Sequence, residues 1–334
     1  MISKCALDAI NHKVPEFVPA YVRNIQEWER HAALLGFKTW EGLADHFGNT
    51  ILSFVPDHKS LPNPKHTTGL PAVWGVPEEY HTTYTDSIPR PLASAETVAD
   101  VEAFSWPSVD DWDFTTMHNR LKEEKDHLRL GPSWMPVFSR LCELFGMERA
   151  MINLYTNRRV IEAALAHLDN FYTEFYRTML DVCADSLDVF GLGDDFAGND
   201  SLLIDPSLWR RLFLPLYAKW FGMAKKKALP TLMHCCGKII EVLPDLIDAG
   251  LDAWQTVQTH LPGQEPETIK SLFGRHLTFV GAIDTTNVLG TASPEAVKEH
   301  VRSRILALGE NGGYICAPDH TVMAEVPTKN LIAL

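Results

Sequence analysis

Positive charge is scarce in this sequence, and it has no long apolar run. The 334 residues include 30 Lys and Arg against 43 Asp and Glu, a formal net charge of −13. Proteins that bind nucleic acid or an anionic membrane surface need a basic face, so this balance argues against both kinds of partner. No apolar stretch approaches the roughly 20 residues of a membrane span, and residues 1–17 contain no apolar secretory core. The sequence therefore predicts a cytoplasmic protein without a membrane segment.

Cysteine is also sparse, with six in the chain. Six irregularly spaced thiols are too few for a disulfide scaffold of this length, and they fit a reducing compartment. Most are explained as small buried side chains. Cys235 and Cys236 stand apart, because they directly follow His234.

Short apolar runs alternate with amphipathic helical patterns along the chain. We expect strands at residues 17–22, 51–55, 128–131, 187–193, 231–235, 253–257, 278–282 and 313–317. Eight such strands, most of them followed by a helical pattern, predict a (β/α)8 TIM barrel that fills residues 1–334 as one domain. Residues 56–107, rich in Pro, Thr and His, form an irregular insertion or active-site cover in this prediction.

A doubly wound open sheet is the alternative fold. It is less favoured because no glycine-rich dinucleotide turn follows the first strand. No phosphate-binding Gly-Lys-Ser/Thr loop occurs either.

Polar residues at the carboxyl ends of barrel strands are where catalysis is expected. His234 and Cys236 are two residues apart at such an end, so both side chains face the same way on a strand while Cys235 faces away. A third ligand from the last strand, either Cys316 or His320, would complete a catalytic zinc site with an open fourth position. The alternative is a core histidine beside apolar cysteines.

Three aspartates also follow strands. Asp194 and Asp195 are adjacent, so mutual repulsion would raise one pKa and suit a proton-handling role. Alternatively, one caps the next helix and the other is solvated; in either case we expect them to face opposite ways. Asp284 is a catalytic or substrate-contacting candidate, or else a helix cap.

Four further residues are candidates for substrate binding. Trp74 and Tyr80, in the irregular segment, would line a pocket for a flat substrate or simply pack the segment onto the barrel. Gln255 and Gln258 lie along and just beyond the predicted strand 253–257 and would present amides to a substrate or fill the barrel end.

The order and spacing of several segments resemble the uroporphyrinogen decarboxylase superfamily. They are MHCCGKIIEVLPDLIDAGLDAWQTVQ, FGRHLTFVGAID and GGYICAPDHTVMAEVPTKNLIAL, preceded by ELFGMERAMINLYTNRRVIEAAL, GDDF and DPSLWRRLFLPLYAKW. The resemblance spans most of the chain and implies a (β/α)8 barrel, in agreement with the strand count. His234-x-Cys236 resembles the zinc motif of the corrinoid-dependent methyltransferase branch, which includes O-demethylase components. The arginine-rich N-terminal motif of the metal-free decarboxylases has no match, since only Arg23 and Arg30 occur there.

The chain departs from that branch at the third zinc ligand. The branch has a cysteine in a Pro-Gly-Cys context, where this sequence has His320, and Cys316 lies four residues earlier. Either residue serves as the ligand, or the metal site is degraded. The Gly-Thr-Gln that follows the paired aspartates in the family is replaced by AGND.

The resemblance implies a zinc-dependent methyltransferase. It would move a methyl group between a small substrate (a methoxy-aromatic, a methylamine or a thiol) and a corrinoid (cobalamin) cofactor on a separate carrier protein, and it would form a homodimer. The alternatives are a metal-free decarboxylase and a non-catalytic barrel that binds a tetrapyrrole or corrinoid.

Overall fold

A parallel sheet organises the chain in the computed structural model, which describes residues 2–61, 70–76 and 90–334. Its seven strands follow the order β1-β4-β5-β6-β7-β8-β9. They are β1 (Ile51–Ser53), β4 (Leu128–Pro132), β5 (Val189–Gly193), β6 (Thr231–His234), β7 (Ala253–Val257), β8 (Thr278–Ile283) and β9 (Tyr314–Pro318). A separate antiparallel pair joins β2 (Asp57–His58) to β3 (Trp112–Asp113).

A single residue, Ala20, closes this sheet into a ring. Ala20 forms parallel bridges with Asn49, just before β1, and with Cys316 of β9. The Tyr21 N–H donates to the Cys316 carbonyl at 2.9 Å, and the Cys316 N–H donates to the Pro19 carbonyl at 2.8 Å. The predicted (β/α)8 barrel is therefore confirmed, with the segment around Ala20 in the eighth position.

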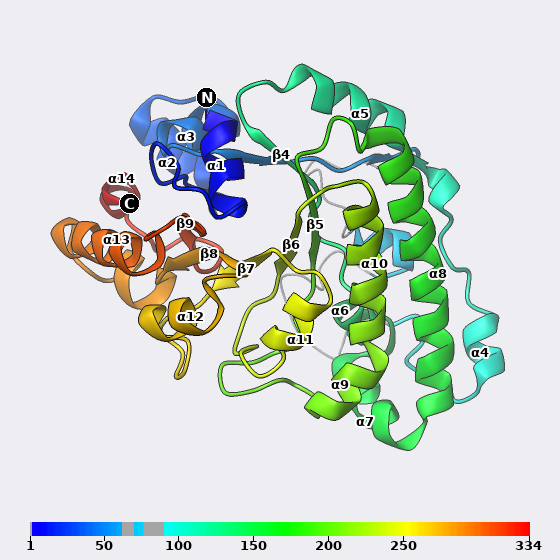
Figure 1. Cartoon of the computed structure of the whole chain (residues 1–334). Helices are drawn as coiled ribbons and strands as arrows, with labels where there is room; N and C mark the ends of the chain where they lie inside the picture. Colours follow the sequence, from blue (N-terminus) through cyan, green and yellow to red (C-terminus); the bar gives the residue numbers. More distant parts are fainter. Residues whose placement is uncertain (1, 62–69, 77–89) are drawn as a thin grey trace.

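Helices cover the outside of this ring (Figure 1). They are α1 (Ile2–Ile10), α2 (Trp28–Leu35), α3 (Trp40–His46), α4 (Val98–Glu102), α5 (Phe114–Glu123), α6 (Phe138–Phe145), α7 (Met147–Thr156), α8 (Arg158–Cys183), α9 (Pro206–Leu212), α10 (Leu214–Lys226), α11 (Leu243–Asp248), α12 (Pro266–Phe273), α13 (Pro294–Leu308) and α14 (Thr328–Ala333). Figure 1 shows α8 and α10 on one side of the sheet, and α1 to α3 close to α14 on the other.

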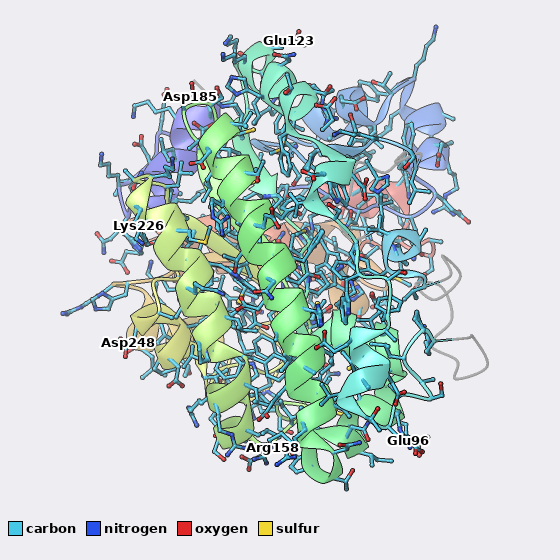
Figure 2. The ribbon with its side chains drawn as sticks, turned by 90° about the vertical axis from the view of Figure 1, so that its right-hand side faces the viewer. Glu96, Glu123, Arg158, Asp185, Lys226 and Asp248 are labelled. Atoms are coloured by element: carbon cyan, nitrogen blue, oxygen red, sulfur yellow. The ribbon has the colours of Figure 1, made fainter. Side chains whose placement is uncertain are left out.

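The long helices α8 and α10 run in the same direction. In Figure 2, Arg158, at the start of α8, lies near the lower edge. Asp185, just beyond the end of α8, and Lys226, at the end of α10, lie toward the upper part. Helices of a β/α barrel run antiparallel to its strands. The carboxyl ends of the strands therefore lie on the side of Arg158.

Two separate apolar cores result from the alternation of side chains along each strand. The inner core lies inside the ring of strands, and the outer core lies between the strands and the surrounding helices. The inner core holds residues such as Leu232, Val280 and Ile315, together with Ala6 and Ala9 of α1. The backbone of α1 contacts the starts of β8 and β9, where the Gly313 N–H donates to the Ala9 carbonyl. Helix α1 thus closes the amino end of the barrel and leaves the carboxyl end for chemistry.

Seven of the eight predicted strands are confirmed, and the eighth position is held by an isolated bridge. The segment 17–22 was expected to be a strand, but only Ala20 pairs, because Pro19 has no N–H to donate to a ladder. The described parts of residues 56–107 contain only short elements, among them β2, the 3₁₀ turn η1 (Pro71–Trp74) and α4. Within the described ranges, every helix is too short or too polar to traverse a lipid bilayer.

Candidate metal centre

Three side chains with metal-binding atoms converge at the ends of β5 and β6. The ligand atoms of Asp195, His234 and Cys236 all lie within 4.8 Å of one another. His234 Nε2 is 3.5 Å from Cys236 Sγ and 3.7 Å from Asp195 Oδ1. The predicted His-x-Cys pair is thus brought together, and a carboxylate from the neighbouring strand joins it.

Backbone alternation and one hydrogen bond hold these donors in place. Cys235 is fully buried in the outer core and faces away from the cluster, as the spacing predicts. The Cys236 N–H donates to Asp195 Oδ1 at 2.9 Å. The next residue, Gly237, has a positive φ of 84°, and its N–H donates to Gln258 Oε1 at 2.7 Å. The turn after β6 is therefore fixed from both sides.

The second nitrogen of His234 has two competing neighbours. His234 Nδ1 lies 3.0 Å from Arg23 Nη2 and 3.3 Å from Gln255 Oε1. With the proton on Nδ1, the ring donates to Gln255 and the Nε2 lone pair is free for a metal ion. With the proton on Nε2, Arg23 donates to Nδ1 instead.

Burial shifts the pKa of each of the three donors in the direction that favours its uncharged form. Desolvation lowers the pKa of His234 well below its usual value, and the Arg23 charge adds to this. Burial raises the pKa of Cys236 well above its usual value, and the Asp195 charge raises it further. Burial and the neighbouring Asp194 raise the pKa of Asp195. A bound divalent cation would lower the pKa of the two acidic donors, Cys236 and Asp195, and so oppose the effect of burial.

The chemistry of this donor set fits zinc. Thiolate, imidazole and carboxylate are the three ligand types that zinc takes from proteins, and a thiolate disfavours magnesium and calcium. Three protein ligands leave a fourth tetrahedral position for a substrate, which is the pattern of catalytic rather than structural zinc sites.

Asp194 has a different role from Asp195. Its buried carboxylate accepts from the N–H groups of Val137, Phe138 and Ser139 at the start of α6. The Tyr217 hydroxyl donates to it at 2.7 Å. The two aspartates do face different ways, and Asp194 accepts from the start of α6, an earlier helix, rather than from the next helix along the chain as expected of a cap.

The two predicted third ligands lie outside the cluster. Cys316 is buried in the outer core, between Ile315 and Ala317, whose side chains belong to the inner core. Burial raises its pKa to about 11. His320 is exposed, and its positive charge contributes to lowering the pKa of His234. The third side chain close to His234 and Cys236 is that of Asp195.

Asp284 belongs to a second group of three ionisable residues. It caps the π-helical turn η4 (Thr285–Leu289) by accepting from the Thr286 and Asn287 N–H groups. The donor atoms of Asp284, His260 and Asp319, one from each side chain, lie within 4.8 Å of one another. These residues follow β7, β8 and β9 in turn. The sequence prediction included Asp284 but did not propose a role for His260 or Asp319.

The four residues proposed for substrate binding have separate outcomes. Gln255 and Gln258 are buried and contact His234 and Gly237, so they support the centre rather than line an open pocket. Trp74 is 1% exposed and packs against aromatic rings of α8. Tyr80 lies outside the described residues.

Two residues near the His-x-Cys pair had a different predicted role or none. Asp195 was expected to handle protons, although its position two residues after Gly193, which pairs with His234, places it on the same face as the motif. Arg23 was set aside because no motif surrounds it. Its segment is irregular, so no periodicity indicated where the side chain lies.

Comparisons with known proteins show the family and the fold of the chain. The sequence model of a family described as uroporphyrinogen decarboxylase (URO-D) matches residues 74–334. A curated methylated-thiol–coenzyme M methyltransferase of Methanosarcina mazei is 25% identical over 135 residues, which are 40% of this chain and 33% of that protein. The chain thus matches about a third of the length of that relative. A solved structure of a methyltransferase from Methanosarcina mazei superposes with a TM-score of 0.69 at 17% identity, covering 100% of this chain and 96% of the other. At that identity the superposition shows the fold alone.

Proposed function

The chain belongs to the uroporphyrinogen decarboxylase family, and from this premise we propose that it is a zinc-dependent methyltransferase. It moves a methyl group between a small substrate and a corrinoid carried on a separate protein. The observation that carries the proposal is the convergence of Asp195, His234 and Cys236 at the carboxyl ends of β5 and β6. The name of the curated relative supports methyl transfer and, among the candidate substrates, favours a thiol over a methoxy-aromatic or a methylamine.

Each residue of the centre has a defined task in this proposal. His234 Nε2, Cys236 Sγ and Asp195 Oδ1 hold the ion, and Gln255 orients the His234 ring. Bound zinc supplies Lewis acidity, which lowers the pKa of a thiol or stabilises a departing anion. Asp195 replaces Cys316 and His320 as the third ligand of the original hypothesis.

A metal-free decarboxylase is the second candidate, and one contact favours it. Arg23 Nη2 lies 3.0 Å from His234 Nδ1, so a guanidinium is present that could bind a substrate carboxylate. This function needs no metal, which makes the metal content of the protein the discriminating property.

Metal analysis of protein purified without chelator tests the proposal. We expect stoichiometric zinc in the wild type, and its loss in the double variant His234→Ala, Cys236→Ala. Cys235→Ala is the matched control, because its buried thiol faces away from the centre. Absence of zinc from the wild type, or retention in the double variant, would refute the metal centre.

Methyl transfer is tested separately with the zinc-loaded protein. Methylated thiols, methoxy-aromatics and methylamines are supplied with a Co(I) corrinoid, and formation of methyl-cobalt is followed by absorbance. A protein that demethylates none of the three classes, and that releases CO₂ from a carboxylated ring equally well after its metal is removed, would favour the second candidate.

A further inference from the structure

A histidine beside the metal centre has one nitrogen held by a carboxylate and the other free. His260 Nδ1 lies 3.2 Å from Asp319 Oδ2 and 3.9 Å from Asp284 Oδ2. Its side chain is 30% exposed. Among the residues that the structure describes, none forms a hydrogen bond with His260 Nε2. The exposed nitrogen is therefore available to a substrate.

The carboxylate that orients this imidazole is itself immobilised. Asp319 is 1% exposed. Its Oδ1 accepts from the Thr285 N–H at 3.0 Å and from the Thr285 hydroxyl at 2.8 Å, which leaves Oδ2 for His260. A fixed carboxylate on one ring nitrogen orients the other for proton transfer, as in acid–base pairs of many enzymes.

Two observations place this pair next to the metal centre. Gln258, two residues before His260, accepts from the N–H of Gly237, which directly follows Cys236. The charge of Asp319 also contributes to raising the pKa of the Cys236 thiol. The His260–Asp319 pair and the three donors therefore share one end of the barrel.

The proposed function needs a proton carrier that the predicted aspartates do not provide. Asp194 is occupied at the start of α6, and Asp195 belongs to the donor set. We propose that His260 Nε2, oriented by Asp319, takes the proton from a substrate thiol as its sulfur reaches the metal centre. This inference rests on the proposed function and names the residue that accepts the substrate proton in that reaction.

The step balances without an oxidant or reductant. The S–H bond breaks, a new N–H bond forms at His260 Nε2, and the sulfur keeps the electron pair. In the methylating direction this sulfur then bonds to the methyl carbon, the methyl–cobalt bond breaks, and the electron pair of that bond stays on cobalt as Co(I). In the demethylating direction, His260 returns the proton to the thiolate that leaves.

The surroundings of His260 suit a group that gains and loses a proton near neutrality. Asp319 and Asp284 face it from the ends of β9 and β8, and together they raise its pKa above the usual value. His300 of α13 lies behind Asp284, with Nε2 3.4 Å from the Asp284 backbone nitrogen. Transfer is most efficient when the pKa of the carrier lies close to the working pH.

Proton release on thiol binding tests the inference without any measurement of turnover. Zinc-loaded protein is titrated with 2-mercaptoethanol by calorimetry in buffers of different ionisation enthalpy, at a pH above the pKa of His260 in the free protein and below the higher pKa that His260 has beside a bound thiolate. The wild type should release less acid to the buffer than His260→Asn, with a difference that approaches about one proton per bound thiol. His167→Asn is the matched control, since His167 of α8 forms a similar pair with Glu102 on the outer surface.

The outcomes separate this inference from the proposed function. If the wild type binds no thiol, both the proposed function and the role of His260 are refuted. If it binds thiol but releases as much acid as His260→Asn, only the role of His260 is refuted. An independent arm is a histidine NMR titration of the metal-free protein, in which Asp319→Asn should lower the pKa of His260; an unchanged pKa would overturn the orienting role of Asp319.

Discussion

The Asp195 carboxylate accepts a hydrogen bond from the Cys236 backbone N–H at 2.9 Å. This contact joins the ends of β5 and β6, and it places a carboxylate oxygen against the two donors of the His-x-Cys motif. In the proposed zinc site the third ligand therefore comes from an adjacent strand rather than from the last one. The centre is assembled within a single β-α-β unit of the barrel.

The first prediction concerns this carboxylate. Asp195→Asn keeps the shape and an acceptor for Cys236 but removes the charge, so zinc affinity should fall by more than about 100-fold, beyond the loss typical of supporting residues. A competition titration with a chromophoric chelator measures it. His320→Ala is the control and should bind zinc like the wild type; the reverse pattern would restore His320 as the ligand.

The second prediction concerns the neighbouring Asp194 and distinguishes its role from that of Asp195. Asp194→Ala leaves the N–H groups of Val137, Phe138 and Ser139 buried without an acceptor. Its free energy of unfolding should fall by about 3 kcal/mol or more, whereas Asp195→Asn, at a half-exposed position, should change it by less than about 1 kcal/mol. Urea unfolding measures both. Equal losses would contradict the division of roles between the two residues.

Much of the fold was predictable because strands and helices differ in period. The apolar runs located the strands of the barrel. An Asp-Pro or Ser-Pro pair is also typical of a helix start, and Asp205-Pro206 and Ser293-Pro294 stand at the starts of α9 and α13, where both capping side chains accept backbone N–H groups. A run of apolar residues does not reveal which face of a strand is inward, since both faces of a covered parallel sheet are buried.

The candidate site shows the effect of that ambiguity. Cys316 was considered a ligand, yet it lies in the outer core between two inward neighbours, and nothing in YICAP distinguishes the two faces. The position of His234 was easier to predict, because a polar residue identifies the face on which it lies. Asp319 and His260 were missed as a pair because their contact joins positions 59 residues apart.

The third prediction concerns Gly237, which follows Cys236. A Cβ at this position would lie 2.6 Å from the Gly198 carbonyl oxygen, and φ is +84°. Gly237→Ala should lower the free energy of unfolding by more than the roughly 1–2 kcal/mol of a left-handed residue, and it should weaken zinc binding. Gly263→Ala is the control, with φ +85° and no atom within 4 Å. Equal effects of the two variants would contradict the clash.

The fourth prediction is a pH dependence of stability. The pKa of His260 is raised in the folded protein, so its protonation stabilises the fold. This contribution is fully present below the unfolded pKa of about 6.5, and it is lost as the pH rises through the folded pKa. The difference in unfolding free energy between wild type and His260→Asn should therefore shrink as the pH increases. A difference that grows with pH would contradict the assigned sign.

The fifth prediction uses the two neighbours of His234 Nδ1, which should act on zinc binding with opposite signs. Gln255 Oε1 accepts the Nδ1 proton and so favours the tautomer whose Nε2 lone pair is free. Gln255→Leu removes that acceptor at similar volume, and zinc affinity should fall by about 10–100-fold.

Arg23 acts on the same nitrogen in the other direction. Its Nη2 donates to Nδ1 only in the tautomer that places the proton on Nε2, and its charge repels a cation. Arg23→Gln should therefore raise zinc affinity, on the order of tenfold for about 1.4 kcal/mol of relieved repulsion. The same competition titration measures both variants at one pH. If both substitutions weaken binding, Arg23 supports the bound ring instead of competing for it, and the tautomer argument is wrong.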